Sequence, residues 1–287
     1  MKLNDTKKGI LCIIAAAFGF ALMSMFVRLS GDLPTMQKAF FRNFVALIIA
    51  SFALAKRGGG LKLSKASWGN IFCRCFFGTS GLIANFYAVD RIGIADANLL
   101  NKLSPFWAIL LSIPLLKEKP GKVDILCTLG AFTGALFIIR PTGVITETLP
   151  ALVGLFGGFG AGCAYVFVRR LSRQNIKTPV IVFYFSLFSC LVALPWLILD
   201  YHPMTAQQWI YLLLAGVFAS LGQFGITTAY RYAPAKEISV FDYTQIVFAA
   251  FLGVFVFAET PAALSVVGYI VIIGIAVFRW VREKNAA

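Results

Sequence analysis

LNKLSPFWAILLSIPLLKEKP, residues 100–120, has a counterpart 141 positions later, FDYTQIVFAAFLGVFVFAETP, residues 241–261. Each stretch begins with polar residues, continues as an apolar run and ends in a Glu-x-Pro sequence. The same offset of 141 relates further residues in the two halves of the chain, among them Gly19 with Gly160 and Arg28 with Arg169. The constant offset indicates an internal repeat.

The composition places the repeat in a membrane. Of the 287 residues, 59% are hydrophobic and 13% charged, whereas a soluble domain is typically about half apolar and a quarter charged. The net charge is +14, but the basic residues gather in short loops. Membrane topology and anionic lipid explain this clustering better than nucleic acid does. We therefore expect a lipid bilayer environment and no nucleic-acid partner.

Membrane helices account for almost the whole chain. A span needs about 20 apolar residues. Windows of that size predict ten transmembrane helices, and so an all-α membrane protein, over residues 9–29, 35–55, 67–89, 94–116, 122–140, 150–170, 178–199, 207–229, 236–257 and 262–281.

Lysine and arginine residues predict the orientation. With the N-terminus in the cytoplasm, 19 of them fall on the cytoplasmic side and five on the outer side. We expect a multi-pass protein of a bacterial-type inner membrane with both termini cytoplasmic. The basic and apolar residues 1–26 resemble a signal peptide, but the repeat includes them, so we interpret them as a retained first helix.

Each copy of the repeat holds five spans. Because five is odd, the second copy enters the membrane from the opposite side. The sequence thus predicts two inverted five-helix repeats, residues 1–141 and 142–287. Inverted repeats of this kind recur in secondary transporters, whose two halves can exchange inward-open and outward-open states.

The two quoted stretches and the five-plus-five arrangement resemble the drug/metabolite transporter superfamily, EamA type. The resemblance covers essentially the whole chain, although Lys117 and Ala258 replace a usual glycine before Glu118 and Glu259. It implies a central cavity lined by spans 1, 3, 4, 6, 8 and 9, with spans 5 and 10 peripheral. It also implies transport of a small organic metabolite, since members carry amino acids, nucleotide sugars, vitamins and other solutes.

A lysine lies near the middle of the fourth predicted span. Lys102 follows Asn98 and Asn101 at helical spacing, so the three share one face. A charge at this depth costs about 2.5–3.5 kcal/mol on insertion scales. We interpret Lys102 as a cationic anchor for an anionic or carboxylate-bearing substrate. The alternative is a lysine paired with a structural carboxylate.

The ninth span carries the matching polar face. Asp242 and Tyr243 are the repeat counterparts of Asn101 and Lys102. Ser239 lies on the same face and Gln245 on a neighbouring one. Asp242 is predicted to contact the opposite charge of a zwitterion or to accept a coupling proton. The alternative is a Lys102–Asp242 ion pair that locks the halves together, or gates them, since a buried pair contributes little net stability.

Other polar residues are weaker candidates for substrate contact. Arg74 in span 3 either contacts substrate or snorkels to the interface. Snorkelling is the favoured interpretation of the shallower Arg42, and its alternative is binding a substrate anion near the outer mouth. Three uncharged residues complete the predicted binding set, Asn85, Gln223 and Trp107.

The sequence does not predict an enzyme. The six cysteines lie in apolar segments without a CxxC motif, and the single histidine, His202, is in a loop. This pattern gives no metal site, no catalytic residues and no cofactor. We found no P-loop for ATP-driven transport. A membrane enzyme acting on lipid would need an acid/base or metal cluster, and a channel or scaffold would not need Lys102 or Asp242.

The sequence therefore predicts a secondary active transporter that moves a small organic metabolite by alternating access, through rocking of the two inverted halves. The Lys102–Asp242 arrangement favours an amino acid-like or other zwitterionic or anionic solute. A vitamin, a nucleotide-type solute or a cationic drug is the alternative within the superfamily. Substrate identity, direction, coupling ion and oligomeric state stay open at this point.

Overall fold

The protein is described from a computed structural model, which covers residues 5–56, 63–92, 94–139, 148–258 and 263–285. All regular structure in these residues is helical. In chain order the helices are α1 (Asp5–Leu29), α2 (Thr35–Lys56), α3 (Lys65–Ile92), α4 (Ile94–Asn101), α5 (Ser104–Leu116), α6 (Lys122–Ile139), α7 (Thr148–Arg173), α8 (Thr178–Leu199), α9 (Ala206–Tyr232), α10 (Ala235–Ile238), the 3₁₀ helix η1 (Ser239–Tyr243), α11 (Thr244–Phe257) and α12 (Ala263–Asn285).

The helices follow the ten predicted spans in order, which confirms the all-α membrane fold. Within the described residues, eight helical segments are long and apolar enough to cross a membrane. The two other predicted spans are α3 and α6. Helix α3 has 28 residues, but Arg74, Asn85 and several glycines and serines lower its hydropathy. Arg140 and the second Glu-x-Pro pair, Glu259 and Pro261, lie outside the described residues.

The fourth and ninth spans are interrupted at equivalent positions. In the fourth, α4 gives way to α5 at Lys102 and Leu103. Pro105 follows in the first turn of α5, where it has no N–H to continue the α4 hydrogen-bond ladder. In the ninth, η1 separates α10 from α11. The residues on either side of both breaks carry the polar side chains that the sequence singled out.

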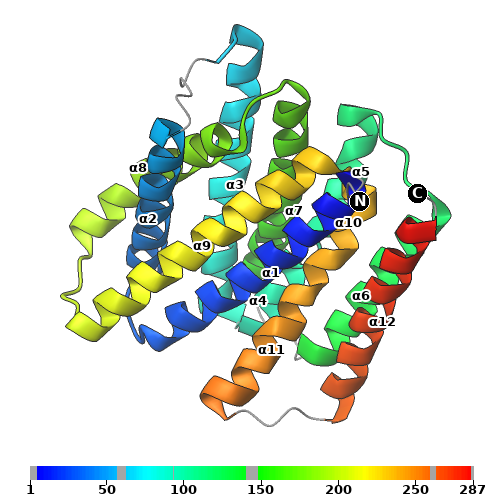
Figure 1. Ribbon diagram of the computed structural model, residues 1–287. Coiled ribbons are helices and arrows are strands. Elements are labelled where there is room, and N and C mark those ends of the chain that lie inside the picture. Colours follow the sequence, from blue (N-terminus) through cyan, green and yellow to red (C-terminus); the bar gives the residue numbers. More distant parts are fainter. Residues whose placement is uncertain (1–4, 57–62, 93, 140–147, 259–262, 286–287) are drawn as a thin grey trace.

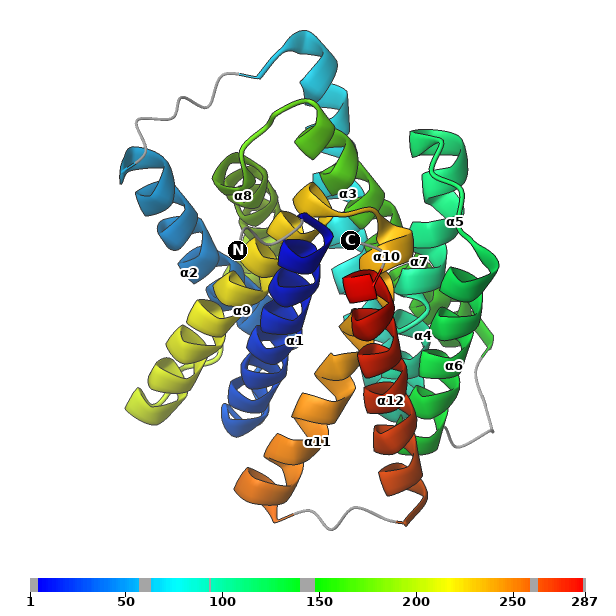
Figure 2. The ribbon, with the colours of Figure 1, turned by 45° about the vertical axis from the view of Figure 1, so that its right-hand side comes forward.

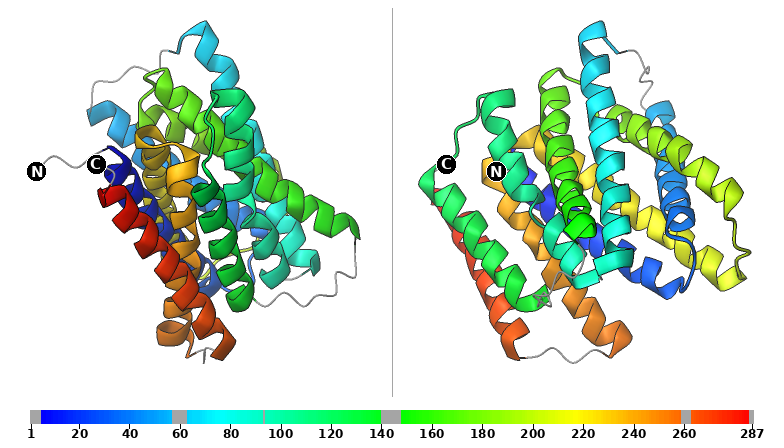
Figure 3. Two further views of the ribbon diagram at one scale, coloured as in Figure 1. Left: turned by 90° about the vertical axis from the view of Figure 1, so that its right-hand side faces the viewer. Right: turned by 180° about the vertical axis from the view of Figure 1, so that it is seen from behind.

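Helix packing follows the symmetry of an inverted repeat. Helices α1 and α9 run side by side, and so do their repeat counterparts α7 and α3 (Figure 1 and Figure 3, right). The α5–α7 contact likewise has a counterpart in α1–α11, while α2 packs on α8 and α6 on α12. The most extensive packing thus joins helices of different halves, so the two halves are interleaved.

Glycines allow close contact at the two equivalent helix crossings, α1 with α9 and α7 with α3. A methyl group on Gly19 of α1 would lie 2.9 Å from the backbone nitrogen of Gly222 in α9. A methyl group on Gly160 of α7 would lie 2.9 Å from the Cα atom of Gly81 in α3. Both Gly19 with Gly160 and Gly81 with Gly222 are separated by 141 positions. Close backbone contact therefore explains why glycine recurs at these positions.

The two ends of the bundle differ. Helix α1 begins and α12 ends at one end, which we name the terminal end (Figure 2). At the other end α1 is followed by α2, and the last turn of α11 lies near the first turn of α12 (Figure 1). We name this the mouth end, because the cavity described next reaches the surface there.

Candidate functional site

A cavity of about 1010 Å³ runs into the bundle from the mouth end. Its rim includes the exposed residues Arg28, Gly31 and Asp32. Its wall is built by α1, α3, α4, α7, α9 and α11, as the family resemblance implied, and also by α2 and by Phe185 of α8. Helix α12 contributes Ser265 and Tyr269 near the rim. The volume is sufficient for a drug-sized organic molecule.

Arg42 of α2 lies on this wall. Its side chain does not snorkel, because the residue is only 7% exposed and lines the cavity. Within the described residues its guanidinium makes no hydrogen bond or ion pair, and its Nε is buried without a partner. A buried cation without a counter-charge is costly unless a ligand supplies one. Arg42 is therefore available to a ligand anion in the cavity.

Arg74 of α3 is the second buried cation on the wall. It is 3% exposed, so it does not snorkel either. Its Nη2 donates to Gln223 Oε1 at 3.1 Å, and its guanidinium lies 4.0 Å from the centre of the Phe185 ring. Its Nε has no partner among the described residues. Gly78, one turn along α3, leaves the space that the guanidinium occupies.

Amide side chains share the cavity wall with the two arginines. The predicted site residues Asn85, Asn98, Asn101, Gln223 and Gln245 all line the cavity. The Oδ1 atom of Asn85 is buried without a partner among the described residues. Amides can donate and accept, so they suit the hydroxyl, amine or amide groups of an organic solute.

Lys102 and Asp242 form a buried ion pair behind the cavity wall. Lys102 Nζ lies 3.1 Å from Asp242 Oδ2 and donates to Gln245 Oε1 at 2.8 Å. Their side chains are 11% and 9% exposed, and neither residue lines the cavity. The geometry is that of the alternative interpretation, an ion pair between the halves. Gln245 accepts a hydrogen bond from Lys102 and also lines the cavity, so it connects this pair to the cavity.

The remaining predicted residues also lie behind the wall. Tyr243 is fully buried, and its hydroxyl donates to the carbonyl oxygen of Lys102 at 2.8 Å. Ser239 bonds the hydroxyl of Tyr230 at 3.1 Å. Trp107 packs edge-on against Phe159, with its Nε1 unpaired among the described residues. None of these three residues lines the cavity.

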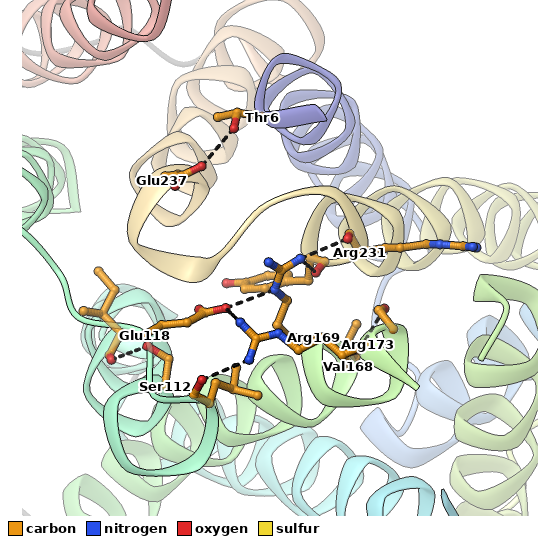
Figure 4. A network of polar contacts seen from close by, with 12 residues as sticks. Thr6, Ser112, Glu118, Val168, Arg169, Arg173, Arg231 and Glu237 are labelled. Atoms are coloured by element: carbon orange, nitrogen blue, oxygen red, sulfur yellow. Dashed lines mark hydrogen bonds and ion pairs between the residues drawn. The ribbon is translucent and has the colours of Figure 1, made fainter. Parts of the chain in front are cut away.

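A network of ion pairs and hydrogen bonds closes the terminal end (Figure 4). Glu118, which follows α5, pairs through one oxygen with Arg169 at 3.2 Å and also with Arg173, both on α7. Arg169 then reaches α9, where it donates to the carbonyl oxygens of Tyr230 and Arg231 at 3.2 and 2.9 Å. Glu118 is only 8% exposed. These contacts join helices that would have to separate to open this end.

Sequence reasoning missed this network as a unit. It identified Glu118 and Arg169 as repeat positions, but a repeat match does not say which residues meet. It also missed Phe185 and Gly78, which hold Arg74 in place. The sequence offered one signal for this part of the site, namely a charged residue, Arg74, inside an apolar segment between Cys73 and Cys75.

The chain matches one protein family twice. The EamA-like transporter family matches residues 7–140 and again residues 148–280. The two matches cover nearly all of both halves of the chain.

Curated relatives extend along the whole chain. The pseudopaline exporter CntI of Pseudomonas aeruginosa is 34% identical over 275 residues, which cover 95% of this chain and 96% of the relative. A riboflavin transporter of Brucella anthropi is 27% identical, over 96% of this chain and 99% of the relative. Solute carrier family 35 member G1 of Homo sapiens is 23% identical, over 96% of this chain and 81% of the relative.

A solved crystal structure shares the fold. It superposes with a TM-score of 0.86 at 16% sequence identity, over 98% of this chain and 99% of the other. At that identity the likeness concerns the arrangement of helices alone.

Proposed function

Because this chain belongs to the EamA-like transporter family and is thus a non-enzymatic membrane transporter of small molecules, we propose that it is a secondary active transporter working by alternating access. In this proposal the five-helix repeats, residues 1–141 and 142–287, supply two equivalent sets of helices. The substrate is a polar organic metabolite, amino acid-like or otherwise zwitterionic or anionic.

One observation carries the proposal, namely a cavity with charged and amide side chains on its wall that is open at one end and closed at the other. The cavity reaches the surface at the mouth end. The Glu118–Arg169–Arg173 network lies at the terminal end. A channel would need a path through both ends at once. A cavity closed by breakable ion pairs fits one state of an alternating cycle.

The interleaved packing suggests which parts move. Helix α1 packs on α9 and α11, and their counterparts α7, α3 and α5 form the equivalent group. We propose that these two groups, rather than the sequence halves, rock against each other. Arg169 crosses from the second group to the α9 carbonyls of the first. Arg28 at the mouth, its repeat counterpart, would then bind the carbonyls at positions 89 and 90 of α3 when the mouth closes.

The Lys102–Asp242 pair is where a coupling proton would act in this proposal. Protonation of Asp242 removes its charge and frees Lys102, which is also bonded to Gln245 on the cavity wall. Occupancy of the cavity and protonation behind it would thereby influence each other through Gln245. Asp242→Asn should then transport without dependence on a pH gradient.

Orientation and direction complete the proposal. Lysine and arginine placement favours a cytoplasmic terminal end in a bacterial-type inner membrane. The described state would then be outward-open. Export is the direction we propose, because the 34% identical relative is named an exporter.

The test is a comparison of solutes in the medium of cells that lack the protein, express it, or express Arg74→Gln. Solute profiling by mass spectrometry should find at least one polar metabolite enriched outside cells with the wild-type protein. That enrichment should fall with Arg74→Gln at equal membrane abundance. Identical extracellular profiles for all three strains, also after loading with candidate metabolites, would contradict the proposal.

A further inference from the structure

The charged residues of the cavity wall are strongly unbalanced. Among the described residues that line it, four are cationic and one is a carboxylate. Asp32 lies on the exposed rim, with Arg28 and Lys38 also near the mouth. Deeper in the wall only Arg42 and Arg74 are charged. An anion that enters would meet positive potential along its whole path.

Within the described residues, no carboxylate pairs with either of the two deep arginines. Arg42 has no hydrogen-bond or ion-pair partner within the described residues. In the same part of the chain, Arg74 contacts the neutral Gln223 and the face of the Phe185 ring and no carboxylate. Asp242, a carboxylate behind the wall, is paired with Lys102 and with neither arginine among the described residues. Both arginines therefore keep their full charge for a ligand.

The two guanidinium groups belong to one site. Arg42, Arg74 and Tyr165 all line the same cavity. A guanidinium presents a planar fork of donors that matches the two oxygens of a carboxylate or phosphate. Two such forks on one wall match two oxyanion groups on one molecule.

We propose that the substrate carries at least two oxyanion groups, carboxylates or phosphates, one bound by Arg42 and the other by Arg74. This inference rests on the proposed transport function and narrows it. The amides Asn98, Asn101 and Gln245 would contact the polar, uncharged part of the molecule. A simple zwitterion with one carboxylate would leave one arginine uncompensated.

The experiment measures binding to the purified full-length protein in detergent by thermal shift. The probes are acetate, succinate, citrate, succinamide, glycerol phosphate, fructose 1,6-bisphosphate and spermidine. Either the dicarboxylate and tricarboxylate or the bisphosphate should raise the unfolding temperature, which also tells the two oxyanion chemistries apart. Acetate, succinamide and spermidine should not. Succinamide matches succinate in shape without its charges, so this comparison needs no variant.

Variants then locate the site. Arg42→Gln and Arg74→Gln should each raise the dissociation constant of the active probe by about ten- to hundredfold, since each removes a charged hydrogen-bond pair. Arg91→Gln is the matched control, because Arg91 is exposed near the mouth end of α3 and does not line the cavity. It should bind like the wild type.

The outcomes separate this inference from the transport proposal. Binding of succinamide or spermidine in place of the anions overturns the two-oxyanion inference and leaves transport standing. Anion binding that survives both arginine substitutions likewise overturns the two-oxyanion inference and leaves transport standing. Loss of binding of every probe, together with unchanged extracellular metabolites, overturns both.

Discussion

The hydroxyl of Tyr243 donates a hydrogen bond to the carbonyl oxygen of Lys102 at 2.8 Å, and these residues occupy the same position in the two repeats. Equivalent residues can touch only where a pseudo-two-fold axis passes between them. The interruptions of the fourth and ninth spans therefore meet at the axis. Irregular backbone at membrane depth is tolerated where protein covers it, and here each break provides polar groups that satisfy the other.

Breaking the Lys102–Asp242 pair from one side should be more harmful than removing it. Lys102→Met leaves a buried carboxylate without its counter-charge, at a cost of about 3–5 kcal/mol. The double variant Lys102→Met/Asp242→Asn should recover most of this loss. Thermal unfolding in detergent measures the stability of the single and the double variant. A double variant no more stable than the worse single one would show that the pair is not the interaction that matters.

Glu118→Gln should weaken the closed end. The substitution removes the charge shared by Arg169 and Arg173 on a side chain that is 7% exposed, which should lower stability by about 1.5–3 kcal/mol. Asp5→Asn is the control at the same end, because the Asp5–Lys8 pair is solvent-exposed and should contribute little to stability. Equal shifts in unfolding temperature for both variants would argue against a closing role for Glu118.

Gly78→Ala should displace Arg74. The added methyl group would lie 2.1 Å from Arg74 Nη1 and 2.9 Å from the Phe185 ring, so the guanidinium must move. We expect binding of the active anion to weaken by about tenfold or more, as for loss of a charged contact. Gly69→Ala, on the same helix with open space around it, should leave binding unchanged. Titration of both variants with the active anion measures this difference in affinity. Unaltered affinity in Gly78→Ala would contradict the assigned position of Arg74.

The repeat-related crossings should respond alike to the same change. Gly19→Ala and Gly160→Ala each place a methyl group within 3 Å of backbone atoms, which cannot rotate away. Overpacking of this kind costs about 1–3 kcal/mol. Gly274→Ala on α12, where the space is open, is the control. Thermal unfolding should show two destabilised variants and one unaffected variant, and a tolerated Gly160→Ala would weaken the symmetric description of the packing.

Much of the fold could be predicted from the sequence because membrane spans are local signals. Apolar runs of about 20 residues and the constant offset gave the helices and the inverted order. The candidate site was predicted less completely. Helical spacing put Asn98, Asn101 and Lys102 on one face. The helix is interrupted at Lys102 and Leu103, however, so Lys102 lies against Asp242 while the two asparagines line the cavity.

The interpretation of Arg42 shows a second limit of local reasoning. Seen in sequence, Arg42 is seven residues from the start of its helix, a position from which arginine can snorkel to the interface. In the fold, neighbouring helices bury it against the cavity. Which wall a side chain faces depends on contacts between distant segments, and the sequence pattern of one helix does not contain them.

The most direct test of the account is the accessibility of the cavity from each side of the membrane. Ala161→Cys places a thiol on the cavity wall, in a background where the two partly exposed cysteines, Cys12 and Cys73, are alanine. A membrane-impermeant thiol reagent is applied to intact cells and to inside-out vesicles. We predict labelling mainly from the outside, with inside labelling rising when Glu118→Gln is added. Equal labelling from both sides, unchanged by Glu118→Gln, would contradict alternating access.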